Sequence, residues 1–298
     1  MRLYRYNRTE HSKAGVSELT VSKYIMRPLS SFLFSIRTIS ELLTMDYNFE
    51  IKLLLNPAVV LDSDHALDHA LLSKFAVKEA AHHMTIQFMD TDNKDLSALG
   101  WLMRIRREEG KDKIELTYKK RYPITGDNVN FALKEAADDH FDIATTKYEL
   151  QVEIGYAKKD LSVAHNKKVD ASEYPGLTLP DKKQSRMLLR KEAPAETIIA
   201  RNSHQFATDP VKSSRVYGPV HATGWSGTFE GVDLDIEVWP IPKASGSSEL
   251  EYVVEASFKT DHGNDATRLK EELINVLRES GWLIEEDSLK TQLVLSHF

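Results

Sequence analysis

The chain has no cysteine among its 298 residues. This excludes disulfide bonds, thiolate metal ligands and a cysteine nucleophile. No apolar run approaches the roughly 18 residues of a membrane-spanning helix, and no G-x-S-x-G segment marks a serine nucleophile. Hydrophobic residues nevertheless make up 41% of the sequence and aromatic residues 9%. We therefore expect a folded protein with a sizeable core, built as one large domain or two ordinary ones.

Acidic residues outnumber basic ones outside the first 45 residues. The net charge of the chain is −6. Residues 1–45 hold seven Lys/Arg and three Asp/Glu, which leaves 32 bases and 42 acids in the remainder. Nucleic-acid-binding proteins normally carry a basic patch, so this acidic body argues against a nucleic-acid partner.

Residues 1–45 differ from the rest in being rich in Ser, Arg and Tyr. Three interpretations stay open: a mitochondrial-type presequence, a disordered extension, or an upstream start with Met45 as the working start. We expect a cytoplasmic protein, or a mitochondrial one if these residues are a presequence. The main domain is predicted over residues 46–298, with an insertion at about 157–200.

Period-two alternation of polar and apolar residues predicts strands along most of this domain. The first strand is Asp46–Leu55, and later ones lie near 85–90, 101–108, 113–122, 148–156, 215–220, 224–230, 232–240 and 249–259. Helical spacing predicts helices at 62–83, 127–147 and 264–281, while the polar stretch 157–200 is predicted to hold at most short strands. The fold class is therefore α+β: an eight-stranded antiparallel β tunnel, a closed or nearly closed barrel, with flanking helices.

The polar faces of these strands are sorted by charge. Arg104 and Arg106 share one face, as do Lys119 and Arg121. Other strands gather acids: Glu149 with Glu153, Asp233 with Asp235 and Glu237, and Glu251 with Glu255. These faces could be the solvated side of an ordinary antiparallel sheet. Sorting by sign favours the inward orientation, because solvated faces usually mix both signs. Facing inward, Arg and Lys would bind successive phosphates, and the carboxylates would bind Mg²⁺ or Mn²⁺.

Over roughly residues 46–298 this pattern resembles the CYTH superfamily, the triphosphate tunnel metalloenzymes. Phe88–Thr91 and Gly100–Arg107 are similar to the family's YFDT and G…LRIR segments, and Leu116–Lys119 is similar to its TLK. Further similar segments are Tyr148–Glu153, Ser214–Tyr217, Asp235–Glu237 and Glu255–Ser257. The resemblance implies a tunnel in which a divalent metal supports triphosphate hydrolysis, RNA capping or ATP cyclisation.

The resemblance also implies roles for individual residues. The expected catalytic residues are Glu50, Lys52 and Arg106; the phosphate-binding residues are Lys52, Arg104, Arg106, Lys119 and Arg215; and the metal ligands are Glu50, Glu153, Asp235, Glu237 and Glu255. Two positions depart from the family pattern, because Asn48 and Ser257 stand where it has carboxylates. Metal affinity depends on the charge of the ligands, so Mg²⁺ or Mn²⁺ is expected to bind weakly.

The sequence thus favours metal-dependent hydrolysis of a phosphoanhydride in a tri- or diphosphate-containing small molecule. Two alternatives remain: a non-catalytic polyanion-binding protein, and a lyase or cyclase of specialised metabolism on the same fold. The expected partner is a phosphorylated small molecule, with no nucleic acid and no membrane. The oligomeric state and the identity of the substrate are left open.

Overall fold

The computed structural model describes residues 47–78, 80–126, 128–139, 141, 147–194, 208–287 and 290–298. The predictions for residues 1–45 fall outside this part of the chain. Among the described residues, none of the helices has the length and apolar character needed to cross a membrane.

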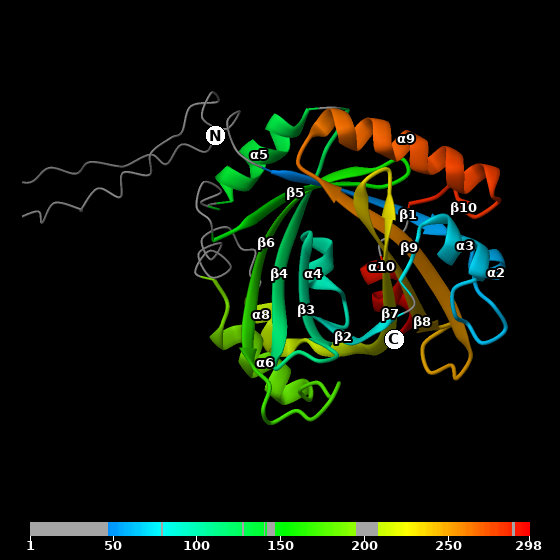
Figure 1. Ribbon diagram of the computed structural model, residues 1–298. Helices are drawn as coiled ribbons and strands as arrows, with labels where there is room; N and C mark the ends of the chain where they lie inside the picture. Colours follow the sequence, from blue (N-terminus) through cyan, green and yellow to red (C-terminus); the bar gives the residue numbers. More distant parts are fainter. Residues whose placement is uncertain are drawn as a thin grey trace, which may run out of the picture. The chain divides into compact units, whose positions relative to one another are not determined.

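Nine strands of the described chain close into a barrel (Figure 1). They are β1 (Asn48–Leu55), β2 (His82–Asp90), β3 (Trp101–Glu108), β4 (Lys113–Pro123), β5 (Glu149–Ile154), β6 (Lys159–Asp170), β7 (Arg215–Phe229), β8 (Val232–Pro242) and β9 (Leu250–Thr260). Their order around the barrel is β1-β5-β6-β4-β3-β2-β7-β8-β9, and β9 pairs again with β1 to close the ring. A short strand, β10 (Leu283–Ile284), pairs with the end of β1.

The barrel that the sequence predicted is therefore present, with two differences. It has nine strands instead of eight, and β1 runs parallel to β5 while the other neighbours are antiparallel. The additional strand is β6, which lies within the stretch 157–200 predicted as an excursion. Leu161 and Val163 on β6 are buried, but its second half is polar and exposed. Lysines there hide the alternation that marks a strand.

The helices also differ from the prediction. The one expected over 127–147 is α5 (Val129–Asp138), and α6 (Lys182–Lys191) lies in the stretch expected to hold at most short strands. The predicted helix at 62–83 is reduced to α3 (His69–Lys74), and β2 already begins at His82. The carboxylate of Asp62 accepts hydrogen bonds from the backbone N–H groups of Asp64 and Ala66. This closes a turn where a helix was expected, because an Asp side chain competes with helical hydrogen bonds.

The helices of the described chain other than α3 lie around the barrel, except α10, which packs against its inner wall. They are α2 (Pro57–Val60), α4 (Asp95–Ala98), α5 (Val129–Asp138), α6 (Lys182–Lys191), α8 (Thr208–Ser213), α9 (Gly263–Glu279) and α10 (Lys290–His297). Helix α9 matches the predicted helix at 264–281 and lies along β1 and β9. It ends before Gly281, whose φ of +70° is the left-handed conformation that commonly terminates a helix.

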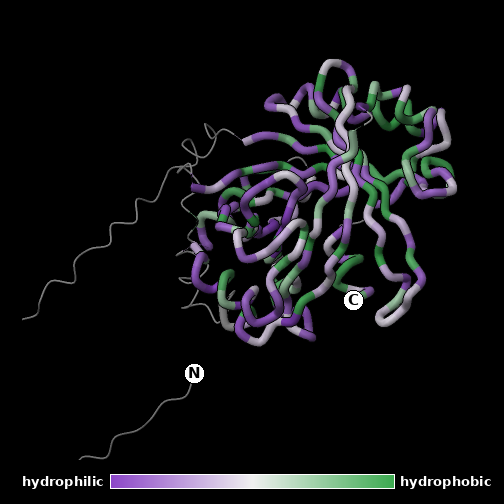
Figure 2. Tube along the Cα trace, turned by 60° about the horizontal axis from the view of Figure 1, so that its bottom comes forward, coloured by the Kyte–Doolittle hydropathy of each residue, from purple (hydrophilic) through white to green (hydrophobic). Residues whose placement is uncertain are grey.

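The main hydrophobic core lies outside the barrel wall, between the strands and the covering helices. Ile51 and Leu53 of β1 pack in this cluster with Leu269 and Leu273 of α9. Figure 2 shows the resulting alternation of hydrophilic and hydrophobic residues along the strands. Because the apolar side of each strand is used for the helices, the polar side is left to face the inside of the barrel.

One part of the barrel interior is apolar, where α10 packs. Phe88, Leu102 and Trp239 on the inner faces of β2, β3 and β8 form a second buried cluster with Val294 and Leu295 of α10. The C-terminal helix therefore lies against the inside of the barrel wall.

Candidate functional site

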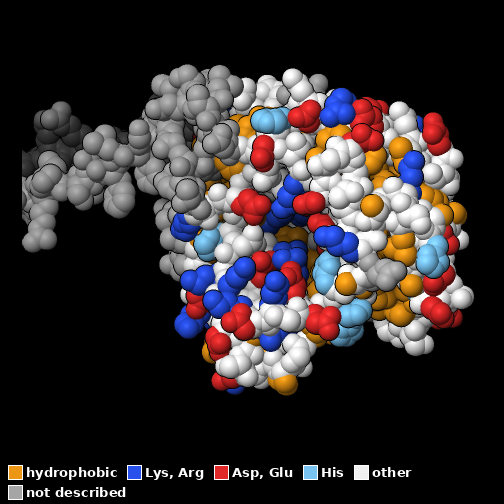
Figure 3. Space-filling view, in the orientation of Figure 1, with side chains coloured by type: hydrophobic (Ala, Val, Ile, Leu, Met, Phe, Trp, Pro, Cys, Tyr) orange, Lys and Arg blue, Asp and Glu red, His pale blue; other side chains and the backbone are white. Residues whose placement is uncertain are grey.

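The barrel encloses a polar cavity of about 420 Å³. Figure 3 shows basic and acidic side chains gathered around a hollow in the face drawn. Eight Lys/Arg and nine Asp/Glu line the cavity, so its charges nearly balance. The expectation that the charged faces point inward is confirmed for the strands that carry these residues. The charged residues that line the cavity are Glu50, Lys52, Arg104, Arg106, Glu115, Lys119, Arg121, Glu149, Glu153, Lys158, Asp160, Glu237, Glu255, Lys259, Glu286, Asp287 and Lys290.

Two arginines of β3 form one wall of this cavity. Arg104 and Arg106 alternate with Ile105, which is fully buried in the outer core. Both guanidinium groups donate from Nη2 to Oε1 of Glu115, at 3.1 and 2.9 Å. The Nε of each arginine is buried and has no hydrogen-bond partner in the described part of the protein. Burial, with the adjacent Arg106, lowers the pKa of Arg104 to about 10.

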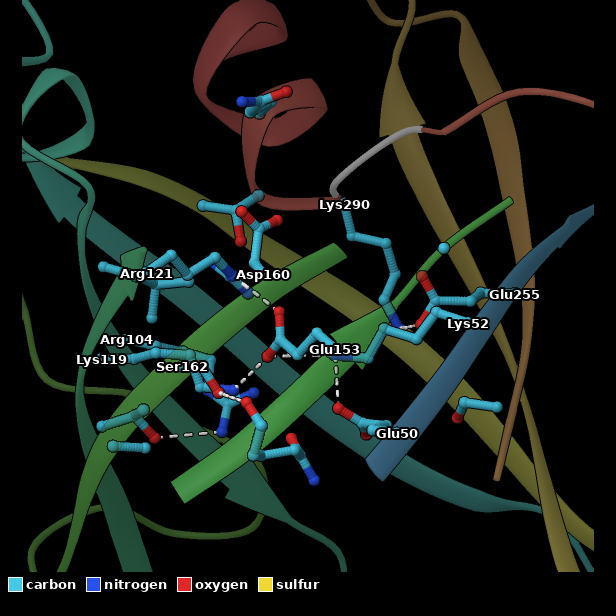
Figure 4. Close-up of a pocket in the computed structure, with 18 of the residues that line it drawn as sticks. Glu50, Lys52, Arg104, Lys119, Arg121, Glu153, Asp160, Ser162, Glu255 and Lys290 are labelled. Atoms are coloured by element: carbon cyan, nitrogen blue, oxygen red, sulfur yellow. Dashed lines mark hydrogen bonds and ion pairs between the residues drawn. The ribbon is translucent and has the colours of Figure 1, made fainter. Parts of the chain in front are cut away.

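Glu153 of β5 lies at the centre of a second group of charges. Its carboxylate is 5% exposed and contacts Lys119 and Arg121 at 2.7 Å each, and Lys52 at 3.4 Å. Burial alone would raise the pKa of Glu153, but these three cations hold it well below its ordinary value. Burial lowers the pKa of Lys119 to about 8. Figure 4 shows Glu153 between these strands, with Lys52 and Glu50 beside it.

The first strand contributes Glu50 and Lys52, which pair with each other at 2.5 Å. Burial would raise the pKa of Glu50, but the neighbouring Lys52 lowers it below the ordinary value. Burial would lower the pKa of Lys52, but Glu153 raises it above the ordinary value. Asn48 is the first residue of the same strand, two positions before Glu50, and its Oδ1 accepts a hydrogen bond of 2.9 Å from Gln151.

Glu237 and Glu255 stand opposite each other on β8 and β9, and we call this pair the acidic corner. Lys290, at the start of α10, forms ion pairs with both: with Glu255 at 2.9 Å, and with Glu237. Its ammonium group also lies 4.7 Å from the ring centre of Trp239, whose indole N–H donates to Glu237 at 2.9 Å. Burial favours the neutral carboxyl, but Lys290 lowers the pKa of Glu237 to about 2.

Two predicted site residues lie away from the main cavity. Asp235 is exposed, accepts a hydrogen bond from Ser226 at 2.8 Å, and lines a smaller hollow that shares Glu50. Arg215 lies 3.0 Å from the Asp92 carboxylate and donates to the backbone carbonyl of Phe298 at 2.9 Å. It does not line the main cavity, and its role as a phosphate-binding residue stays a prediction.

The donor set does not fit a divalent cation in this arrangement. Glu50, Glu153, Glu237 and Glu255 are each paired with a lysine or arginine. Within the described ranges, no group of three or more His, Asp or Glu side chains is arranged to hold a metal ion. Mg²⁺ and Mn²⁺ favour several converging oxygen ligands, and here the converging groups are ammonium and guanidinium ions.

The sequence prediction omitted several residues that line the cavity. Arg121 and Glu115 lie on β4, on the same inward face as Lys119. Strand alternation places both residues on that face, although neither was among the expected site residues. Asp160 was missed because its strand, β6, was missed. Burial raises the pKa of this carboxyl, and no hydrogen bond or ion pair from the described residues reaches it. Lys290 could not have been found from strand alternation, because it comes from a helix.

Comparisons with known proteins found similar solved structures. A Hippeastrum protein, HpAC1, is a candidate adenylyl cyclase described as having a dominant triphosphatase activity. It is 16% identical, with a TM-score of 0.49 over 84% of this chain and 99% of its own. A candidate adenylate cyclase from Bacillus halodurans is 14% identical, with a TM-score of 0.46 over 83% and 96%.

A protein from Pyrococcus horikoshii is 13% identical, with a TM-score of 0.42 over 84% and 98% of the two chains. No protein-family model matches the sequence, and none of the curated proteins does.

Proposed function

We propose that the barrel cavity binds the phosphate groups of a small molecule carrying a di- or triphosphate, and that it hydrolyses a phosphoanhydride bond in that molecule. The observation that carries this proposal is the arginine pair of β3. Arg104 and Arg106 are largely buried, point into the cavity, and share the single carboxylate oxygen of Glu115. Arg106 also pairs with Glu108, and Arg104 also donates to Thr117. The Nε of each arginine has no partner in the described part of the protein, which leaves donors for an oxyanion.

The remaining cations extend this binding surface. Lys119 and Arg121 on β4 and Lys52 on β1 line the same cavity and share the carboxylate of Glu153. A linear phosphate chain could exchange these contacts for its own oxygens, with Arg binding in a bidentate manner. The cavity volume of about 420 Å³ is within the usual range for small-molecule sites.

Hydrolysis requires a base for the attacking water, and we assign this role to Asp160. Glu50 and Glu153 are poor candidates because their lysine and arginine partners stabilise the charged form. Asp160 lines the cavity without such a pair. The water oxygen forms a bond to phosphorus and gives its proton to Asp160. The bridging P–O bond breaks, and its electrons leave with the released phosphate, which the cations stabilise.

A substrate panel tests this proposal. Inorganic triphosphate, nucleoside triphosphates and isoprenyl diphosphates would be assayed for phosphate release with Mg²⁺, with Mn²⁺ and with a chelator. We expect at least one of them to be hydrolysed, and the Arg106→Ala variant to lose that activity. Absence of turnover for every member would contradict hydrolysis, and absence of binding as well would contradict the whole proposal.

A specific observation also favours a second function, polyanion binding without catalysis. The carboxylates that a metal would need are held by cations, whereas the phosphate-binding cations remain in place. Tight binding without phosphate release would support this function. A cyclised or rearranged organic product would instead indicate a cyclase or lyase.

A further inference from the structure

The position of Lys290 is fixed by the packing of the C-terminal helix. Val294 and Leu295 of α10 are buried against the apolar inner wall of the barrel. The ring of His297 contacts the backbone carbonyl of Pro242 at 2.9 Å and the carboxylate of Glu251 at 2.9 Å. These contacts anchor the helix beyond its first turn, so its first residue is delivered into the cavity.

Lys290 is held there on three sides. Its ammonium group pairs with Glu237 and Glu255 and lies over the Trp239 ring. The side chain is only 17% exposed, and Glu255 is 6% exposed. Figure 4 shows Lys290 reaching from the C-terminal segment toward Glu255.

We propose that Lys290 is a tethered cation that occupies the acidic corner in place of a divalent metal, so that the cavity binds its polyanion without Mg²⁺ or Mn²⁺. An ammonium group supplies one positive charge and three hydrogen-bond donors. A divalent ion could bind Glu237 and Glu255 only after displacing the ammonium group of Lys290 from both carboxylates. The side chain belongs to the same chain, so its local concentration is high and independent of the metal content of the solution.

Two other carboxylates of the cavity, Glu153 and Glu50, do not offer a better place for a metal. Glu153 already contacts three cations, and Glu50 is paired with Lys52. The two carboxylates of the acidic corner are largely removed from water, which is costly for a charged group without a partner. Without a cation beside them they would also repel each other. Removing the charge of Lys290 should therefore create a metal site that the wild type lacks.

The test is Mn²⁺ binding, followed by the loss of the free Mn²⁺ signal in electron paramagnetic resonance, with no substrate present. The Lys290→Met variant keeps an apolar stem against Trp239 but removes the charge. We expect its dissociation constant for Mn²⁺ to be at least about tenfold smaller than that of the wild type, because two carboxylates become available. Adding Glu255→Gln to this variant should abolish the gain.

Two controls distinguish the effect of the charge at position 290 from the effect of removing any positive charge from the cavity. Lys290→Arg keeps a cation and should bind Mn²⁺ no better than the wild type. Lys158→Met removes an exposed lysine of the same cavity that pairs with neither member of the acidic corner, and should also leave Mn²⁺ binding unchanged. Circular dichroism and the melting temperature of each variant would establish that it is folded.

The proposal is overturned if the wild type binds Mn²⁺ tightly and Glu255→Gln abolishes that binding. This outcome does not depend on whether Lys290→Met folds. It is also overturned if folded Lys290→Met gains no Mn²⁺ affinity. The part that concerns polyanion binding rests on the proposed function, and calorimetry with inorganic tripolyphosphate in EDTA tests it separately. Failure to bind tripolyphosphate under any condition would contradict the proposed function, while binding only with Mn²⁺ would contradict the tethered cation.

Discussion

Arg104 and Arg106 donate hydrogen bonds to the same atom, Oε1 of Glu115, at 3.1 and 2.9 Å. Arg106 also pairs with Glu108 at 3.0 Å, so two partly buried positive charges on β3 are balanced by Glu115 and Glu108. Neighbouring like charges in a poorly hydrated cavity repel each other. An incoming phosphate would relieve this repulsion, which makes the arginine pair the most direct target for mutation.

We predict that Arg106→Ala weakens binding of inorganic tripolyphosphate, measured by calorimetry, by roughly a hundredfold, or about 3 kcal/mol by analogy with other preorganised donors. Arg106→Lys should recover part of this loss, since it restores the charge without the bidentate geometry. Arg268→Ala, on the exposed surface of α9, is the matched control and should bind normally. Equal affinities of Arg106→Ala and the wild type would remove Arg106 from the site.

Glu153 should be important for stability as well as for the site. Replacing it by Gln leaves three cations without their shared carboxylate, and we expect a loss of about 3 to 5 kcal/mol in the free energy of unfolding. Chemical denaturation at pH 7 would measure it. Glu249→Gln, which disrupts an exposed pair with Lys243, should cost less than about 1 kcal/mol.

The same carboxylate predicts a pH dependence. Burial raises the pKa of Glu153, but Lys52, Lys119 and Arg121 together lower it well below normal. A group with a depressed pKa stabilises the fold above its unfolded-state pKa, about 4.3 for Glu, and this contribution is lost as the pH falls below that value. Between about pH 5 and pH 3 the wild type should therefore lose stability more steeply than Glu153→Gln. Parallel curves in denaturation experiments would contradict this assignment.

Two glycines allow a test of close packing at the edge of the site. Gly100 and Gly110 have similar positive φ angles, +79° and +70°. A Cβ at Gly100 would lie 2.9 Å from the carbonyl oxygen of Arg121, whereas one at Gly110 would meet nothing within 4 Å. Both alanine variants incur the left-handed strain of about 1 to 2 kcal/mol. Thermal denaturation should show the larger loss for Gly100→Ala, and an equal loss would argue against the contact.

The structure changes one expectation about Asn48. In the family pattern that the sequence resembles, a carboxylate stands at this position, and metal affinity depends on the charge of the ligands. Asn48 is hydrogen-bonded to Gln151 on the parallel neighbour β5. We therefore predict that Asn48→Glu leaves Mn²⁺ affinity, measured by calorimetry, unchanged in the wild-type background. A clear gain in affinity would restore the metal site that the family resemblance implied.

Strand alternation alone predicts a barrel and much of its lining. Period-two alternation depends on neighbouring residues alone, so it placed Arg104 and Arg106 on one face and Glu153 on another. Sorted charge then indicated that these faces point inward, and the outer core under α9 explains why. The same local signal failed for β6, where lysines at both parities removed the contrast between its two faces.

Only the tertiary structure decided which charges meet. Alternation states on which face of a strand a side chain lies, but not which strand is its neighbour, and so it could not reveal that Glu153 joins Lys52, Lys119 and Arg121. Nor could it reveal that a helix far along the chain delivers Lys290 to Glu237 and Glu255. Ion pairing depends on distances of a few ångströms between residues remote in sequence, and those distances are set by barrel closure and helix packing.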